Sequence, residues 1–366
     1  MARIANTSPR KNIPALLNLL HLQAKMERAP GFSHYLGFLP EHLQPSLFRY
    51  EKNRLDFRYK LSHELALPTK ADTTVTLSTY LAILDEVTTW ASMASQPKNP
   101  RPGVTVNFQM DWGPAAHLGT ALGSEVDITA TVTKTGRNLG FIRAEVRDQD
   151  TGQLVCFGSH TKFMPLSKPM EFLLSPWGQW GLNLYAKYVL PQKNTEHPKP
   201  QEEYYLSELF TSLHFESPTT ATFTAGPQHF NGLGGLHGGC QAIVMELMAR
   251  HVATTELAGA APHLDSIQVS YLSSASKQMR IKAEILVTSP TYVTMRLLLQ
   301  RMDGTLISEG VLSFADSMTA ASTSIAGKER ITAYSNAAPS TNTATTQRTM
   351  STYTGAQPSG LFQSRL

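Results

Sequence analysis

The sequence predicts an α+β fold in which two antiparallel sheets are each wrapped around a central helix. The 366-residue chain repeats one pattern, a long apolar helix followed by strand-like runs. A G-x-L-x-x-x-G turn-and-strand motif marks the repeat, because it starts at Gly152 and again at Gly304. The long helix of each copy is apolar almost all round, so it must be buried on most sides. A curved antiparallel sheet around each helix would bury it in this way.

The first copy is expected to cover residues 13–165. It begins with a helix near 13–28, whose apolar stripe suits packing, and continues with an extended stretch over 46–66. Its central helix is expected over 77–94. Three strand-like runs follow at 103–112, 124–136 and 139–164, the last of which is broken by a turn at Asp150–Thr151–Gly152.

The second copy is expected to cover residues 201–319 and repeats this order. A helix near 201–210 and an extended run over 212–225 precede its central helix at 238–257. Its strand-like runs cover 264–272, 278–289 and 292–315, with a turn at Asp303–Gly304 in the last one. Duplication of one unit is the simplest explanation of this periodicity.

Three segments lie outside the two copies. Residues 1–12 carry basic residues without an acid and are expected to be flexible. Residues 166–200 contain five prolines and no clear period, which predicts an ordered connector. Residues 320–366 are rich in Ser, Thr, Ala and Asn and hold few large apolar groups, which predicts a disordered tail.

Composition excludes several classes of function. The formal net charge is +4, and the tail alone contributes +3 of it (four Lys and Arg against one Glu), so the body is close to neutral. Nucleic acid is therefore not expected as a partner, because phosphate binding needs a concentrated basic face. No apolar run is long enough to span a membrane. Two cysteines and histidines without metal-ligand spacing predict no metal site.

The most informative segment is the glycine-rich loop that leads into the second central helix. Glycines permit a tight turn there, and the helix start presents unpaired N–H groups together with the positive end of the helix dipole. Such a start can hold the oxyanion of an acyl-transfer intermediate. Asn231 and His237 flank the loop. In the alternative interpretation, the glycines only shape a turn and His237 caps the helix.

This segment resembles the hotdog acyl-CoA thioesterases of the phenylacetate (PaaI-like) type. The resemblance rests on Asn231, His237, Gly238 and Gly239, and on a carboxylate, Glu246, eight residues after Gly238. It extends over roughly 13–165 and 200–316, and it implies thioester hydrolysis of acyl-CoA without a cofactor or a metal. In the first copy, Asp85 falls where the second copy has Glu246.

Helix geometry predicts that the catalytic groups come from both copies. Gly238 and Glu246 are eight residues apart, about 12 Å along one helix. Both could not approach one carbonyl, so the carboxylate has to come from another helix that runs antiparallel alongside. In the family that this segment resembles, that helix belongs to a second subunit, and here the other copy can supply it. The resemblance then implies that Asp85 serves as general base or nucleophile. The remaining members of this site are expected to be Gly238 as oxyanion donor, Asn231, His237, Thr105 in the position of the family's hydroxyl, and Gly239 as a substrate-binding residue.

A second site, related to the first by the repeat, is expected to be degenerate. It would join Glu246 to the start of the first helix, where Thr76, Leu77 and Ser78 replace His-Gly-Gly. Leu264 falls where this site needs a hydroxyl. One working site per chain is therefore predicted. The competing interpretation of Asp85 is an exposed position on a solvated helix face beside Glu86.

Two other activities fit a double hotdog architecture. An enoyl-CoA hydratase would resemble a G-D-x-N-P-x-H loop, which the sequence lacks. A non-catalytic acyl-CoA-binding protein would explain the missing His-Gly-Gly of the first copy. Thioesterases of the TesB type share the architecture, but their Asp-Thr-Gln site does not match. Association of several copies through sheet edges or faces is also expected from the resemblance.

The last three residues, Ser364-Arg365-Leu366, resemble the S-K-L peroxisomal address. A peroxisomal import receptor is therefore an expected partner, and the peroxisome is the expected location. The alternatives are the cytoplasm and, because of the basic N-terminal segment, the mitochondrion.

Overall fold

The computed structural model describes most of both predicted copies. The described residues are 16–17, 31–38, 43–68, 73–96, 100–116, 122–165, 168, 172–173, 175–188, 205–231, 235–257, 262–275 and 277–316. The predicted flexible start over 1–12, almost all of the helix near 13–28, and the tail over 320–366 with Ser364, Arg365 and Leu366 lie outside them.

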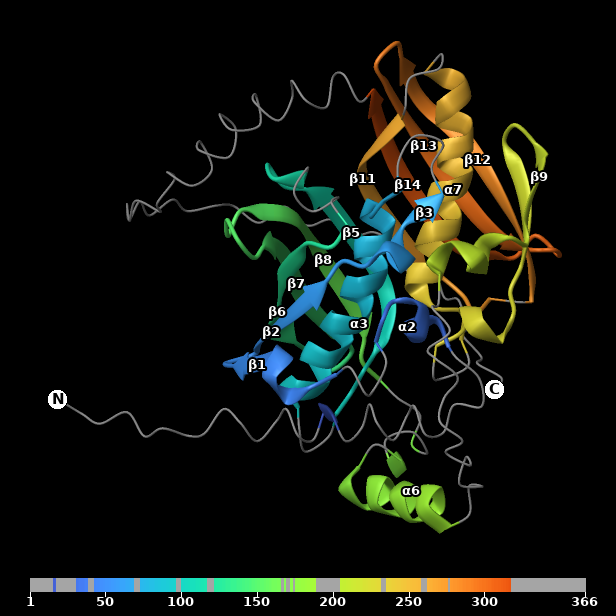
Figure 1. Cartoon of the computed structure of the whole chain (residues 1–366). Helices are drawn as coiled ribbons and strands as arrows, with labels where there is room; N and C mark the ends of the chain where they lie inside the picture. The colour runs from blue at the N-terminus through green and yellow to red at the C-terminus, as the bar shows by residue number, and fades with distance from the viewer. Residues whose placement is uncertain are drawn as a thin grey trace, which may run out of the picture.

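One curved antiparallel sheet of twelve strands forms most of the structure (Figure 1). In spatial order its strands are β1 (Phe48–Glu51), β2 (Arg54–Lys60), β6 (Glu125–Thr135), β7 (Leu139–Asp148), β8 (Leu154–Phe163), β5 (Val104–Trp112), β11 (Pro262–Tyr271), β14 (Leu306–Asp316), β13 (Tyr292–Arg301), β12 (Gln278–Ser289), β10 (Thr220–Thr224) and β9 (Leu213–Ser217). A separate short ribbon pairs β3 (Leu67–Pro68) with β4 (Thr73–Thr74).

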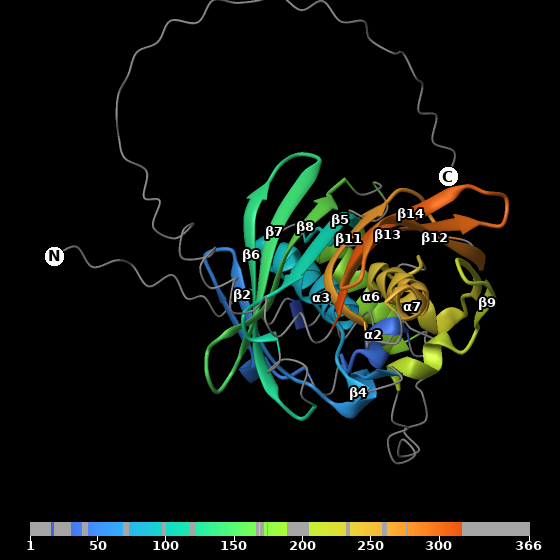
Figure 2. The same ribbon diagram turned by 90° about the horizontal axis from the view of Figure 1, so that it is seen from above.

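The two halves of the sheet have the same strand order, read from the outer edge to the middle. They meet where β5 pairs with β11 in antiparallel register, with Phe108 opposite Val269. Figure 2 shows the result from above: each half curves around one long helix, and the two helices lie on the same side of the sheet. The predicted fold class is therefore confirmed, with α+β architecture and antiparallel strands wrapped around a central helix.

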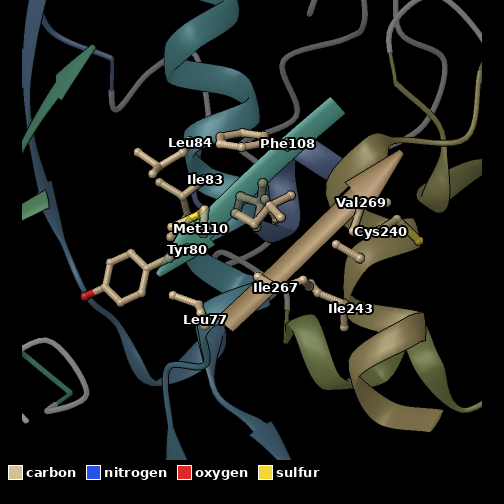
Figure 3. Close-up of a cluster of buried hydrophobic side chains, with 14 of the residues drawn as sticks. Leu77, Tyr80, Ile83, Leu84, Phe108, Met110, Cys240, Ile243, Ile267 and Val269 are labelled. Atoms are coloured by element: carbon tan, nitrogen blue, oxygen red, sulfur yellow. The ribbon is translucent and has the colours of Figure 1, made fainter. Parts of the chain in front are cut away.

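The two central helices are α3 (Leu77–Ser95) and α7 (Gly238–Glu256), close to the predicted ranges. Thr76 caps α3, because its hydroxyl accepts a hydrogen bond from the Thr79 N–H at 3.3 Å. Apolar side chains from both helices meet apolar side chains of β5 and β11 in one core (Figure 3). Ile83, Phe108, Ile243 and Ile267 belong to this core and are almost completely buried. The core thus continues across the junction between the halves.

The structure corrects two predictions made for the segments between the two halves of the sheet. The helix expected near 201–210 is a single 3-10 turn, η4 (Leu206–Phe210), in its described part. The connector contains an unpredicted helix, α6 (Pro176–Tyr188), which lies apart from the two halves of the sheet (Figure 1). Trp177 and Trp180 on α6 are 76% and 62% exposed.

Four short helical elements complete the described structure. They are α2 (Phe32–Tyr35), η2 (Pro45–Leu47), η3 (His63–Leu65) and η5 (Pro227–His229). Within the described ranges, no helix combines the length and the hydrophobicity needed to cross a bilayer.

Candidate active site

The two central helices run past each other in opposite directions. Moving forward along α3, Ser78 meets Glu246 and Ala82 meets Gly239, which is an earlier position on α7. Asp85 then meets Gly238 at the start of α7, where a Cβ on Gly238 would lie 2.8 Å from Asp85 Oδ2. The acid of one half therefore lies against the glycine turn of the other half, as the helix geometry required.

Gly238 and Gly239 have no room for a side chain, each because of a different neighbouring residue. The Asp85 carboxylate occupies the space that a side chain at Gly238 would need. A Cβ on Gly239 would come within 2.5 Å of the Ala82 Cα, so Gly239 allows the backbones of α3 and α7 to approach closely. The structure thus gives Gly239 a packing function, whereas substrate binding by this residue stays a prediction.

Asp85 is buried and is surrounded by partners from two strands. The Thr105 hydroxyl on β5 donates a hydrogen bond to Asp85 Oδ1 at 2.9 Å. On β8, Lys162 Nζ lies 3.6 Å and His160 Nε2 lies 3.7 Å from the same oxygen. The interpretation of Asp85 as an exposed residue on a solvated helix face is therefore wrong.

These partners hold the carboxyl in its ionised form. Burial alone would raise the pKa of Asp85, but the positive charge of Lys162 and the neighbouring histidines His237 and His160, together with the Thr105 hydrogen bond, lower this pKa to about 2. Burial lowers the pKa of Lys162, while Asp85 and Glu86 oppose that shift. The site therefore keeps Asp85 in its carboxylate form at neutral pH.

His160 lies between Thr105, the hydrogen-bond donor to Asp85, and Thr88 on α3. Its Nε2 lies 3.1 Å from the Thr105 hydroxyl, its Nδ1 lies 2.7 Å from the Thr88 hydroxyl, and its ring stacks on Phe108. Burial and the charge of Lys162 hold the pKa of His160 well below its ordinary value, although Asp85 opposes this shift. A neutral imidazole with its proton on Nε2 would donate to Thr105, which in turn donates to Asp85.

His237 caps α7 and also faces the first half of the chain. Its Nδ1 accepts a hydrogen bond from the Gly239 N–H at 3.0 Å, and its Nε2 lies 3.0 Å from Glu86 Oε1 on α3. Asp85 Oδ2 lies 3.7 Å from Nδ1. His237 thus caps the helix, and it also lies between two carboxylates at the start of α7.

Asn231 and Tyr271 complete the surroundings of the glycine turn. Asn231 Oδ1 accepts a hydrogen bond from the Gly235 N–H at 3.0 Å, which ties the residue to its own loop. Tyr271 on β11 donates from its hydroxyl to the Gly238 carbonyl at 3.0 Å. Burial keeps the pKa of Tyr271 well above its ordinary value, so this hydroxyl remains a donor. The structure brings Asp85, Thr105, His237 and Gly238 together, and it joins Asn231 to Gly235 of the same loop.

The pseudo-symmetric site around Glu246 has different contacts. Glu246 is one methylene longer than Asp85, and its Oε2 accepts a hydrogen bond from the Ser78 N–H at 3.3 Å. Its other oxygen is bound by Arg250 on the same helix. Leu264, which replaces the hydroxyl, is buried in the core. The Glu246 carboxylate thus accepts a hydrogen bond from an N–H group at the start of α3. A group of this kind would otherwise be available to a substrate.

Replacing Glu246 by Ala is therefore expected to destabilise the protein without changing hydrolysis per folded molecule. Removing one member of a buried ion pair costs about 3–5 kcal/mol. We expect about 3 kcal/mol, because Arg250 retains a hydrogen bond to the Pro262 carbonyl at 2.6 Å. Chemical denaturation measures the loss. A fall in activity of tenfold or more in the folded variant would show instead that the second site works.

Sequence reasoning missed four residues that surround Asp85 and Gly238. They are Glu86, His160, Lys162 and Tyr271. A signal for two of them exists in β8, where Phe157 and Phe163 are 36% and 44% exposed while His160 and Lys162 face the core. Polar residues on the inner face of a strand and aromatic residues on its outer face invert the usual pattern, which marks a buried polar site.

Metal coordination has no support among the described residues. No cluster of three or more His, Cys, Asp or Glu side chains with ligand geometry occurs in this part of the chain. The cation beside Asp85 is the Lys162 ammonium itself.

Residues 75–155 match the family model described as the thioesterase superfamily. This segment contains α3 with Asp85, β5 with Thr105, and strands β6 and β7. The match therefore falls in the half of the chain that contributes the carboxylate.

Two relatives share this similarity. The chain is 30% identical over 82 residues to acyl-coenzyme A thioesterase 13 from Mus musculus and, with the same figures, to its Homo sapiens counterpart. The matched segment is 22% of this chain and 54% of each relative, so the chain spans about half the length of the curated relatives it matches. Among solved structures, the 12:0-ACP thioesterase from Umbellularia californica has a TM-score of 0.48 at 11% identity, with coverage of 72% of this chain and 95% of that one.

Proposed function

We propose that the chain hydrolyses acyl-CoA thioesters at one composite site. The observation that carries this proposal is the position of the Asp85 carboxylate against Gly238, the first residue of α7. A carboxylate and a helix start that converge on one point can act on the same carbonyl group. The names of the relatives support acyl-CoA as the substrate class. In this proposal, residues 13–165 and 201–319 are tandem hotdog domains of the PaaI-like type.

The start of α7 supplies the electrostatic stabilisation. Gly238 is the first helical residue, so its N–H has no partner within the helix. The thioester carbonyl oxygen accepts a hydrogen bond from this N–H, and the helix dipole adds positive potential at the same point. As the carbonyl carbon becomes tetrahedral, the oxygen gains negative charge and the interaction strengthens. One donor of this kind contributes about 2.7–4 kcal/mol to transition-state stabilisation.

Asp85 supplies the base. It removes a proton from a water molecule while that water forms a bond to the carbonyl carbon. The tetrahedral intermediate then collapses, the carbon–sulfur bond breaks with its electron pair on sulfur, and the CoA thiolate takes up a proton. A direct attack by Asp85, which would give a mixed anhydride, is the alternative chemistry with the same residue. Thr105 orients the carboxylate in either case, through its 2.9 Å hydrogen bond.

The proposal is tested with the full chain and a panel of acyl-CoA substrates that differ in length and in aromatic content. Release of the free CoA thiol in catalytic amounts is the expected result. Crotonyl-CoA separates the rival activities, since loss of the conjugated enoyl absorbance without thiol release would show hydration instead. Tight binding of acyl-CoA without either reaction would overturn the enzyme assignment in favour of a carrier.

A further inference from the structure

We propose that Glu86 is a positioning residue, which holds the His237 imidazole in the orientation that caps α7 beside Asp85. The pair joins the two halves, because Glu86 lies on α3 and His237 precedes α7. The inference rests on the proposed hydrolase function and adds a residue to its site. The separation of 3.0 Å between Glu86 Oε1 and His237 Nε2 is shorter than the 3.7 Å between Asp85 Oδ2 and His237 Nδ1.

The two nitrogens of His237 have different tasks. Nδ1 accepts the Gly239 N–H at 3.0 Å, so in the neutral ring the proton must be on Nε2. Nε2–H then donates to Glu86 Oε1 at 3.0 Å. The His237 side chain is only 5% exposed, so without Glu86 this N–H would lose its acceptor in a buried place. Glu86 therefore selects the tautomer that leaves Nδ1 free to accept.

Glu86 is itself held by the N-terminal part of the chain. The Ser33 hydroxyl on α2 donates to the same Oε1, and the ring of the neighbouring Phe32 lies 4.7 Å from the His237 ring, centroid to centroid. The Phe32 N–H also donates to the Phe230 carbonyl at 3.3 Å. Elements from three parts of the sequence thus restrict the imidazole, which is the arrangement expected of a preorganised site.

Protonation of His237 would change its contacts. A proton on Nδ1 removes the acceptor of the Gly239 N–H and points instead toward Asp85 Oδ2, 3.7 Å away. The pKa of His237 is raised above its ordinary value. Burial and the charge of Lys162 lower this pKa, but the hydrogen bond to Glu86 and the negative charges of Asp85 and Glu86 raise it by more. His237 can cap α7 only when its ring is neutral, because only then does Nδ1 accept a hydrogen bond. We therefore assign the active state of the site to the neutral form of His237. Activity then increases as the pH rises through the pKa of His237.

Two substitutions separate the charge of Glu86 from its ability to accept a hydrogen bond. Glu86→Gln retains an amide oxygen for the Nε2–H but removes the negative charge. We expect the pKa of His237 to fall by about one unit, so the acid limb of the kcat/KM profile moves by the same amount to lower pH. Glu86→Ala removes both features and is expected to lower kcat about tenfold at every pH, with a smaller change in KM. Glu145→Gln, at an exposed position on β7, is the matched control and should change neither quantity.

Nitrogen-15 NMR of the histidine rings provides a readout that does not depend on turnover. In the wild-type chain, His237 should titrate above an ordinary histidine and show its proton on Nε2 when neutral. Glu86→Gln should lower that pKa. The proposal is wrong if the pKa of His237 is the same in wild type and in Glu86→Gln, or if Glu86→Ala leaves the tautomer of the neutral ring unchanged. A wild-type chain without thioesterase activity would overturn the proposed function alone, since the NMR titration would still decide whether Glu86 positions His237.

Discussion

Replacing Asp85 by Asn is expected to lower kcat/KM for acyl-CoA hydrolysis by about 10²–10⁴-fold. This range is the usual contribution of a positioned general base. The amide has nearly the same size and can still accept the Thr105 hydrogen bond, so the side chain should keep its position, but Lys162 loses its counter-ion and the free energy of unfolding should fall as well. The comparison is therefore made per folded molecule. The amide cannot take a proton from water or attack a thioester. The measurement is the rate of CoA release by the variant and by the wild-type chain on the best substrate of the panel.

The matched control for this experiment is Asp127→Asn. Asp127 lies on β6, is about half exposed, and forms an ion pair with Arg58 at 3.2 Å. Its replacement should leave kcat/KM within about twofold of wild type, because surface ion pairs contribute little. If Asp85→Asn retained an activity within twofold of wild type, Asp85 would be neither the base nor the nucleophile.

Replacing Lys162 by Met is expected to lower the free energy of unfolding by about 3–5 kcal/mol at neutral pH. The ammonium is the positive charge that faces Asp85, and both side chains are almost completely buried. Removal of one member of such a pair leaves an uncompensated charge in the interior, which accounts for the size of the effect. Urea denaturation at pH 7 measures it. Lys60→Met is the control, because Lys60 is exposed at the end of β2 and its loss should cost less than about 0.5 kcal/mol.

The destabilisation by Lys162→Met should depend on pH with a defined sign. In the wild-type chain, the pKa of Asp85 is lowered to about 2, below the value of about 3.9 in an unfolded chain. The ionised form therefore stabilises the fold fully above pH 4, and this contribution is lost as the pH falls toward 2. Without the charge of Lys162, we expect the pKa of Asp85 to be higher than in the wild-type chain. The deficit of the variant should then shrink between pH 7 and pH 4.5, and a constant deficit would show that Lys162 acts by packing alone.

The apolar pattern and the turn residues of the sequence predicted the two central helices and the two glycine turns. The central helices at 77–94 and 238–257 and the turns near Gly152 and Gly304 lie where the apolar pattern and the turn residues placed them. The helix length also predicted that Asp85 and Gly238 would come from different halves. A rise of 1.5 Å per residue leaves no other way to bring an acid to a helix start.

The contacts that complete the site depend on tertiary structure and could not be derived in the same way. The alternation of β8 marks an inner polar face at His160 and Lys162, but only the tertiary structure shows that this face lies against Asp85. Glu86 differs from Asp85 by one position, yet it faces His237 of the other half. Helix α6 escaped prediction because the two glycines within it, Gly178 and Gly181, weaken its helical propensity.

The pairing of β5 with β11 has a consequence for how the catalytic partners stay together. Asp85 and Gly238 belong to one polypeptide, so their effective concentration is set by folding and does not fall on dilution. In a symmetric homodimer every substitution would enter two equivalent sites at once. Here Glu246 and Leu264 stand at the positions that correspond to Asp85 and Thr105, so a substitution can change one interface between the central helices and leave the other unchanged.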